Sequence, residues 1–154
     1  MFFENWLFQL IGLLPQSIAI VALGTAIVKE RYSYKQIILA GLLITLLGFI
    51  VYYIPLNYGL HVPLNIIIVI FVLRFALNLN ILKSAMASLL SFITLIIIEL
   101  LVYFAQLRVF GISEDFFPTA NDLQKFLIAL PTLIILVLIS ILFQVIRRRQ
   151  YRTR

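Results

Sequence analysis

The chain has 154 residues, of which 64% are hydrophobic and only 12% are charged, and its formal net charge is +6. A soluble domain is usually about a quarter charged, so a water-soluble fold of this length could not cover so much apolar surface. The absence of cysteine excludes disulfides, thiolate metal sites and thiol nucleophiles, and a single histidine, His61, argues against a zinc site.

Long apolar stretches separated by short polar breaks predict an all-α, polytopic membrane protein. Each bilayer-spanning helix takes about 20 apolar residues, and five stretches meet this length. They cover residues 6–28, 36–54, 63–82, 84–107 and 126–146.

Two boundaries need comment. No lysine or arginine precedes the first stretch, so it lacks the basic region of a cleavable signal peptide, and we expect it to be retained. The third and fourth stretches are nearly continuous and together have twice the length of one span. We therefore expect a break at 78–84, with Ser84 as the N-cap of the fourth helix.

Basic residues alternate with neutral or acidic segments along the chain. Lys29, Arg31 and Lys35 lie in the first connection and Lys83 in the third, whereas the second and fourth connections are neutral or acidic. Positively charged loops stay in the cytoplasm, so the pattern predicts an external N-terminus and a cytoplasmic C-terminus.

The basic tail, residues 147–154, follows the last stretch. We expect it to lie on anionic lipid of the inner leaflet, in preference to docking nucleic acid or a protein. The residues predicted to anchor it are Arg147, Arg148, Arg149, Arg152 and Arg154.

Two charges interrupt the apolar stretches, Arg74 in the third and Glu99 in the fourth. Counted from a turn at 78–84, their heights differ by roughly 9 Å, which predicts an intramembrane ion pair. The pair is either a structural lock or part of a ligand-responsive switch or proton relay. The polar side chains expected to support it are Ser84, Ser88, Ser91, Gln9, Gln16 and Asn78.

Small residues predict where the helices touch. Gly41, Thr45 and Gly48 form one narrow stripe on the second span, which suits close contact with a neighbour. Pro15 in the first span removes a backbone donor and is expected to kink that helix.

The segment 109–126 is the longest polar stretch outside the tail, and we expect it on the outer face. It is either a connector resting on the membrane or a lid that contacts a ligand, and Asn121 with Gln124 resembles a capping box opening the last helix. His61 is a hydrogen-bonded interface residue or a ligand-sensing one. The residues of this outer region are His61, Glu114, Asp115, Phe116 and Phe117.

Residues 55–101, PLNYGLHVPLNIIIVIFVLRFALNLNILKSAMASLLSFITLIIIELL, resemble the membrane module of Gram-positive sensor histidine kinases of the GHKL type, which include Agr-type peptide receptors. The shared features are the loop at 55–61, Leu-Lys-Ser-Ala at 82–85, Ser-Phe at 91–92 and Glu99. The resemblance implies a plasma-membrane protein that passes an external signal through its bundle. We expect no kinase domain after Arg154, so the chain is a stand-alone module or a truncated one.

We therefore expect a non-catalytic receptor-like module without cofactors, partnered by the bilayer and by a protein or a second copy, with a peptide or lipid as a further candidate ligand. A small scaffold or accessory subunit of a membrane complex is the alternative, with Arg74 and Glu99 fixing helix register. A transporter would show an internal repeat, and an enzyme would need a nucleophile, a base and an orienting group at one depth.

Overall fold

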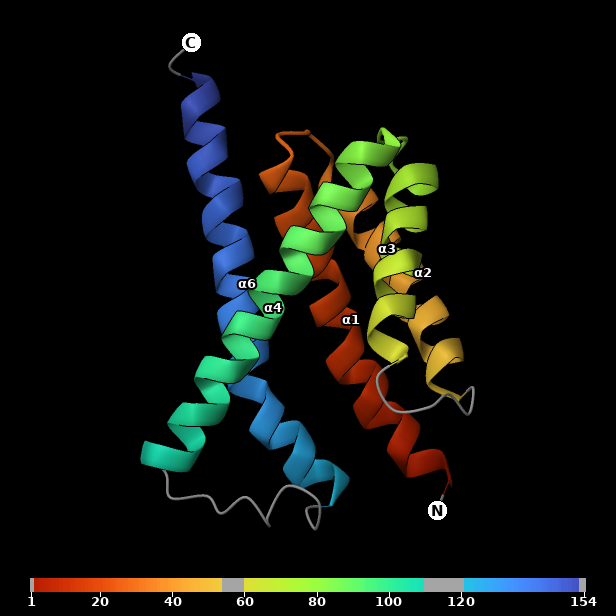
Figure 1. The fold of residues 1–154 in the computed structure, drawn as a ribbon, viewed down its shortest axis with the longest axis vertical. Coiled ribbons are helices and arrows are strands. Elements are labelled where there is room, and N and C mark those ends of the chain that lie inside the picture. The colour runs from red at the N-terminus through yellow and green to blue at the C-terminus, as the bar shows by residue number, and fades with distance from the viewer. Residues whose placement is uncertain (1, 54–59, 110–120, 153–154) are drawn as a thin grey trace.

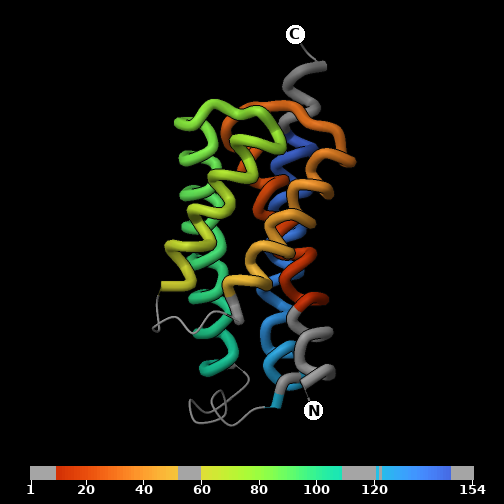
Figure 2. The backbone as a smooth tube through the Cα atoms, turned by 90° about the vertical axis from the view of Figure 1, so that its right-hand side faces the viewer, coloured from red at the N-terminus to blue at the C-terminus, as the bar shows by residue number. Residues whose placement is uncertain are grey.

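The computed structural model describes residues 2–53, 60–109 and 121–152, and within them every regular element is a helix (Figures 1 and 2). The helices are α1 (Phe2–Ile27), α2 (Tyr34–Tyr53), α3 (His61–Ala76), α4 (Ile81–Val109) and α6 (Asp122–Arg152). By length and hydropathy α1, α2, α4 and α6 are each able to cross a membrane, whereas α3 is an apolar helix of only 16 residues. The predicted all-α class and its membrane character are confirmed at this level.

Large apolar side chains cover the outside of the bundle. Phe75 is 71% exposed and Leu101 is 65% exposed, and α2 and α6 also turn leucine and isoleucine outward. Patches of this extent do not persist in water on a monomeric protein, whereas hydrocarbon solvates them without cost. The exposed surface thus has the composition of a lipid-facing one.

Helix α1 lies at the centre of the bundle. It packs against α2, α4 and α6, while α3 packs against α2 and α4 (Figure 1). The helices α1 to α4 therefore pack in a closed ring, and α6 packs beside this ring against α1 and α4. Helix α1 is central because it contacts α6 as well as its two neighbours in the ring. The central position explains why Val21, Leu23 and Thr25 of α1 are almost completely buried.

Small residues let the helices approach closely, as predicted for the second span. A Cβ atom on Gly41 would lie 2.5 Å from Cγ1 and 2.9 Å from Cα of Ile18, so α1 and α2 touch at backbone distance. Thr45, one turn further, is buried and donates its hydroxyl to the Gly41 carbonyl at 2.9 Å. Gly24 of α1 makes the equivalent approach to Ala87 and Ser91 of α4.

The α3–α4 turn differs from its prediction. Helix α3 ends at Ala76 instead of continuing to 82, and Asn78 takes a left-handed conformation with φ 52°. Helix α4 then begins at Ile81, and the Asn80 side chain accepts the Leu82 N–H at 3.3 Å. Ser84 as N-cap is therefore wrong, because Asn80 has that role and asparagine tolerates left-handed and capping geometry well.

Two connections meet at one end of the bundle, which we call the basic end because Lys29, Arg31, Lys35 and Lys83 lie there. The Tyr32 hydroxyl donates to the Leu77 carbonyl at 2.8 Å, and Lys83 forms an ion pair with Glu30. Burial, and then the negative charge of Glu30, raises the pKa of the Tyr32 phenol. Tyr32 therefore stays protonated, and able to donate, to higher pH than an exposed tyrosine.

Reciprocal capping boxes open two helices. Asn121 and Gln124 each accept the other's backbone N–H at 2.9 Å, which confirms the predicted start of the last helix. Ser33 and Gln36 make the same exchange at α2, at 3.3 and 2.9 Å. Both boxes satisfy backbone donors that the first turn of a helix leaves free.

Helix α1 closes with a Schellman motif built on a lysine. The Glu30 N–H donates to the Thr25 carbonyl at 3.1 Å and the Lys29 N–H to the Ala26 carbonyl at 3.3 Å. Lys29 has φ 60°, a left-handed conformation usually given to glycine at this position. A lysine there stores backbone strain.

Replacing Lys29 with glycine is expected to stabilise the protein by about 1 kcal/mol, because the left-handed conformation costs a residue with a Cβ roughly that much. The measurement is the midpoint of thermal unfolding in detergent micelles. Lys29→Ala is the control, since it removes the same side chain but keeps the strained Cβ. Equal stabilisation by both variants would show that charge, and not backbone strain, is responsible.

Candidate functional site

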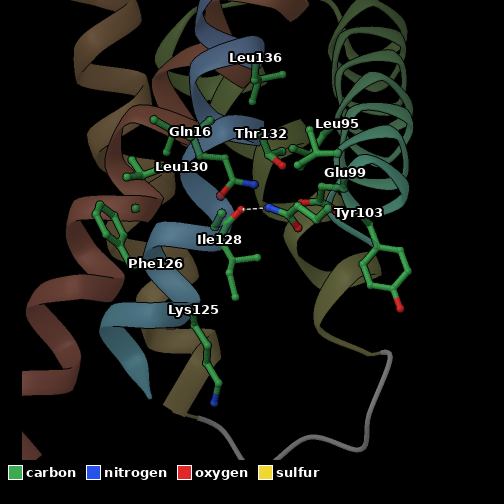
Figure 3. Close-up of a pocket in the computed structure, with 15 residues that line it drawn as sticks. Gln16, Leu95, Glu99, Tyr103, Lys125, Phe126, Ile128, Leu130, Thr132 and Leu136 are labelled. Atoms are coloured by element: carbon green, nitrogen blue, oxygen red, sulfur yellow. Dashed lines mark hydrogen bonds between the residues drawn. The ribbon is translucent and has the colours of Figure 1, made fainter. Parts of the chain in front are cut away.

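A cavity of about 300 Å³ lies between α1, α4 and α6 in the half of the bundle away from the basic end (Figure 3). Gln16 of α1, Glu99 of α4 and Thr132 of α6 point into it, so each of the three helices contributes at least one polar side chain. Lys125 lines the cavity through its stem while its amine points away from the centre. The remaining wall is mostly apolar.

Gly12 lines this cavity, and Pro131 lies next to two of its lining residues, Leu130 and Thr132. Gly12 puts no side chain into it, and a Cβ there would still be 3.9 Å from the Phe126 ring. Pro131 interrupts the hydrogen-bond ladder of α6, and nearby the Gln106 side chain donates to the Ile128 carbonyl at 2.7 Å. Helix α1 continues unbroken past Pro15, which adjoins Gln16.

Glu99 has no hydrogen bond or ion pair within the described ranges, 2–53, 60–109 and 121–152. The predicted pair with Arg74 does not form: the Arg74 guanidinium instead donates to the Leu79 carbonyl at 3.1 Å. The earlier end of α3 is the reason. Arg74 lies two residues before Ala76, whereas Glu99 follows Ile81 by 18 residues, about 27 Å along α4.

Ser84, Ser88 and Ser91 form a buried face of α4, as predicted, but they do not connect Glu99 with Arg74. Ser88 Oγ donates to the Ile66 carbonyl of α3 at 3.1 Å, and Ser91 Oγ to the Ile20 carbonyl of α1 at 3.2 Å. Ser84 Oγ is buried with no hydrogen-bond partner among the described residues. Because α4 crosses the bundle obliquely (Figure 1), the same face meets the cavity two turns later, at Glu99.

Gln16 also borders a second, smaller cavity of about 130 Å³ between α1, α2 and α3. His61 and Asn65 of α3 line it together with Ser17 and Thr45. The predicted outer residue His61 therefore faces the bundle and not only its surface. Gln16 of α1 thus borders both cavities, each of which has a few polar side chains in a mostly apolar wall.

Of the other predicted residues, Asn78 is described and lines neither cavity, and the rest are not described at the level of their side chains. Asn78 lies in the α3–α4 turn, and Gln9 lies in α1 with a side chain outside the described part of the chain. Glu114, Asp115, Phe116 and Phe117 fall outside the described residues altogether, as does Arg154. Helix α6 continues through four arginines of the predicted tail, whose side chains are not among those described: Arg147, Arg148, Arg149 and Arg152.

Gln106, Lys125, Thr132 and Asn65 were missed at the level of sequence. Gln106 follows Glu99 by seven residues, which is close to two helical turns, so extending the Ser84–Glu99 face would have found it. Thr132 and Lys125 carry no such signal, because their position depends on how α6 crosses α4. Within the described part of the chain, no three histidine, aspartate or glutamate side chains gather to hold a metal.

The chain matches no protein-family model, no curated protein and no solved structure.

Proposed function

We propose that this chain is a non-catalytic, receptor-like membrane module that binds a small cationic ligand in the α1–α4–α6 cavity. The observation that carries the proposal is the carboxylate of Glu99, which has no partner among the residues that the structure describes and faces a cavity of about 300 Å³ inside a lipid-facing bundle. A lone carboxylate at membrane depth is costly and is normally paired or lines a pathway or ligand site. A ligand cation supplies the missing partner.

An organic ammonium group fits the lining. Glu99 can accept a charge-assisted hydrogen bond, and Gln16 and Thr132 offer further acceptor oxygens (Figure 3). The apolar remainder of the wall suits an attached hydrocarbon group. Concave, mostly apolar pockets with a few convergent polar groups are the usual form of a small-molecule site.

The proposal includes five membrane spans, an external N-terminus and location in the plasma membrane of a Gram-positive bacterium. Support for the orientation comes from the shared position of Lys29, Arg31, Lys35 and Lys83 at one end of the bundle, which agrees with the positive-inside rule. The cavity would then lie in the outer half of the membrane. The resemblance to sensor-kinase modules stays a prediction, and α6 offers the route for a signal because it runs from the cavity to the basic end.

The test is a thermal-shift titration of the protein in nanodiscs with primary alkylammonium salts, using alcohols of the same chain length as neutral probes. We expect stabilisation by the ammonium compounds alone, reaching about 2.7 kcal/mol at a hundredfold excess over Kd. Glu99→Gln should abolish this response without lowering the stability of the unliganded protein, because it removes an unpaired charge.

Glu30→Gln is the matched control, since Glu30 is paired with Lys83 at the basic end and should leave the response intact. An unchanged ammonium response in Glu99→Gln would refute the site. Loss of unliganded stability in that variant would instead assign Glu99 a structural role.

The second candidate is an accessory subunit that assembles with another membrane protein. It is favoured by the exposure of Glu99, because a basic residue on a partner helix could reach the same carboxylate from the lipid side. Purification in a mild detergent tests this alternative. A partner that co-purifies with the wild type and is lost in Glu99→Gln would favour assembly over ligand binding.

A further inference from the structure

Apart from the two cavities described above, an almost wholly apolar groove of about 360 Å³ runs along the outside of the bundle. Its floor is α1, where Pro15, Ala19 and Ala22 are small enough to leave a channel, and its walls are α2 and α6. It is distinct from the Glu99 cavity: the two share no lining residue among those described. The floor spans the nine residues from Leu14 to Ala22, whose eight steps of 1.5 Å cover about 12 Å.

The groove ends among positive charges. Tyr34, at the start of α2, and Gln144 of α6 border it toward the basic end. Lys35 follows Tyr34 directly, and Arg31 precedes it by three residues. The nearest acidic residue on the connection before α2 is Glu30, which is paired with Lys83. An apolar channel therefore opens at one end toward basic residues of the α1–α2 connection and of the first turn of α2.

We infer that this groove is a specific site for an anionic phospholipid, with one acyl chain along α1 and the phosphate at the basic end. Its length is close to the depth of one leaflet, since the bilayer core is about 30 Å thick. Basic pockets between membrane helices commonly hold anionic headgroups. The bound acyl chain fills the groove and so stabilises the packing of α2 and α6 against α1.

A second copy of the chain is a poorer occupant on grounds of charge. A two-fold contact through the groove would bring Arg31 and Lys35 of one copy close to the same residues of the other. Like charges juxtaposed across an interface oppose association, whereas a phosphate is attracted by them. The charges at the end of the groove thus select a lipid.

The experiment is native mass spectrometry of the protein released from nanodiscs that contain equal amounts of phosphatidylglycerol and phosphatidylcholine. We expect one retained phosphatidylglycerol per chain. Ala22→Phe, which fills the floor, should lower retention of both lipids about tenfold. Ile141→Trp narrows the groove from the α6 wall and replaces it if Ala22→Phe does not fold.

The headgroup is tested separately. Lys35→Gln combined with Arg31→Gln should lower the preference for phosphatidylglycerol about tenfold while retention of phosphatidylcholine is unchanged. Arg108→Gln, in the last turn of α4 at the opposite end of the bundle, is the matched charge control and should behave as the wild type. Leu46→Phe on the exposed face of α2 is the matched control for added bulk.

Two results would overturn the inference. Equal lipid retention by the wild type and both groove-filling variants would mean that the bound lipid is a general coat. Conversion of a dimer to a monomer by these variants, without a change in lipid, would make the groove a contact between copies. The ammonium response of Glu99 is unaffected by either result, so the two proposals fail independently.

Discussion

Replacing Gly41 with isoleucine is expected to destabilise the protein by about 3 kcal/mol or more, because α1 and α2 cannot separate locally without losing the rest of their contact. The added Cβ would lie 2.5 Å from Cγ1, 2.9 Å from Cα and 3.0 Å from N of Ile18. The side-chain atom can rotate away, but the two backbone atoms can move only if the helices shift. Unfolding by sodium dodecyl sulfate in mixed micelles measures the loss.

Gly48→Ala provides the comparison on the same helix and the same face. Its Cβ would lie 3.5 Å from Oδ1 of Asn65, an ordinary contact, so stability should change little or rise slightly as helix propensity improves. Gly41→Ala should fall between these variants. If Gly41→Ile and Gly48→Ala unfold at the same surfactant concentration, the close approach of α1 to α2 is wrong.

The second large effect is expected at Ser91, where α4 crosses α1. Ser91 is completely buried, and its oxygen lies 3.1 Å from the position that a Cβ on Gly24 would occupy. Ser91→Leu should cost about 3 kcal/mol, since overpacking a filled contact forces backbone shifts. Thermal unfolding in micelles, followed by circular dichroism, gives the size of the loss.

Two alanine variants separate packing from hydrogen bonding at this face. Ser91→Ala removes the bond to Ile20 and should cost about 0.6 kcal/mol, the average for such bonds between membrane helices. Ser84→Ala removes a buried hydroxyl without a partner in the described part of the chain, so stability should hold or increase. A larger loss for Ser84→Ala than for Ser91→Ala would contradict these assignments.

The sequence predicted what depends on local chemistry. Apolar length located the helices, Asn121 and Gln124 marked the start of the last one, and Gly41 with Thr45 identified a packed face. Each of these signals lies within one helix or one turn, where spacing and residue type determine the result.

The end of α3 was misjudged because Leu77, Leu79 and Ile81 continue the apolar stretch while Asn78 turns the chain. Hydropathy does not register a left-handed residue. The expected depth of Arg74 relative to Glu99 depended on that boundary. The predicted ion pair was therefore wrong for the same reason. The cavities could not be predicted, because they depend on the crossing of α4 over α1 and α6.

The central position of α1 has a consequence for how the protein is made. Gln144 of α6 donates to the Ala22 carbonyl at 2.8 Å across 122 positions of sequence, and α6 is a principal neighbour of α1. Helices enter the bilayer in the order of synthesis. The face of α1 that packs against α6 therefore stays uncovered until α6 has been inserted. During that interval this face is open to lipid, and the contact between α1 and α6 forms only after α6 has been inserted.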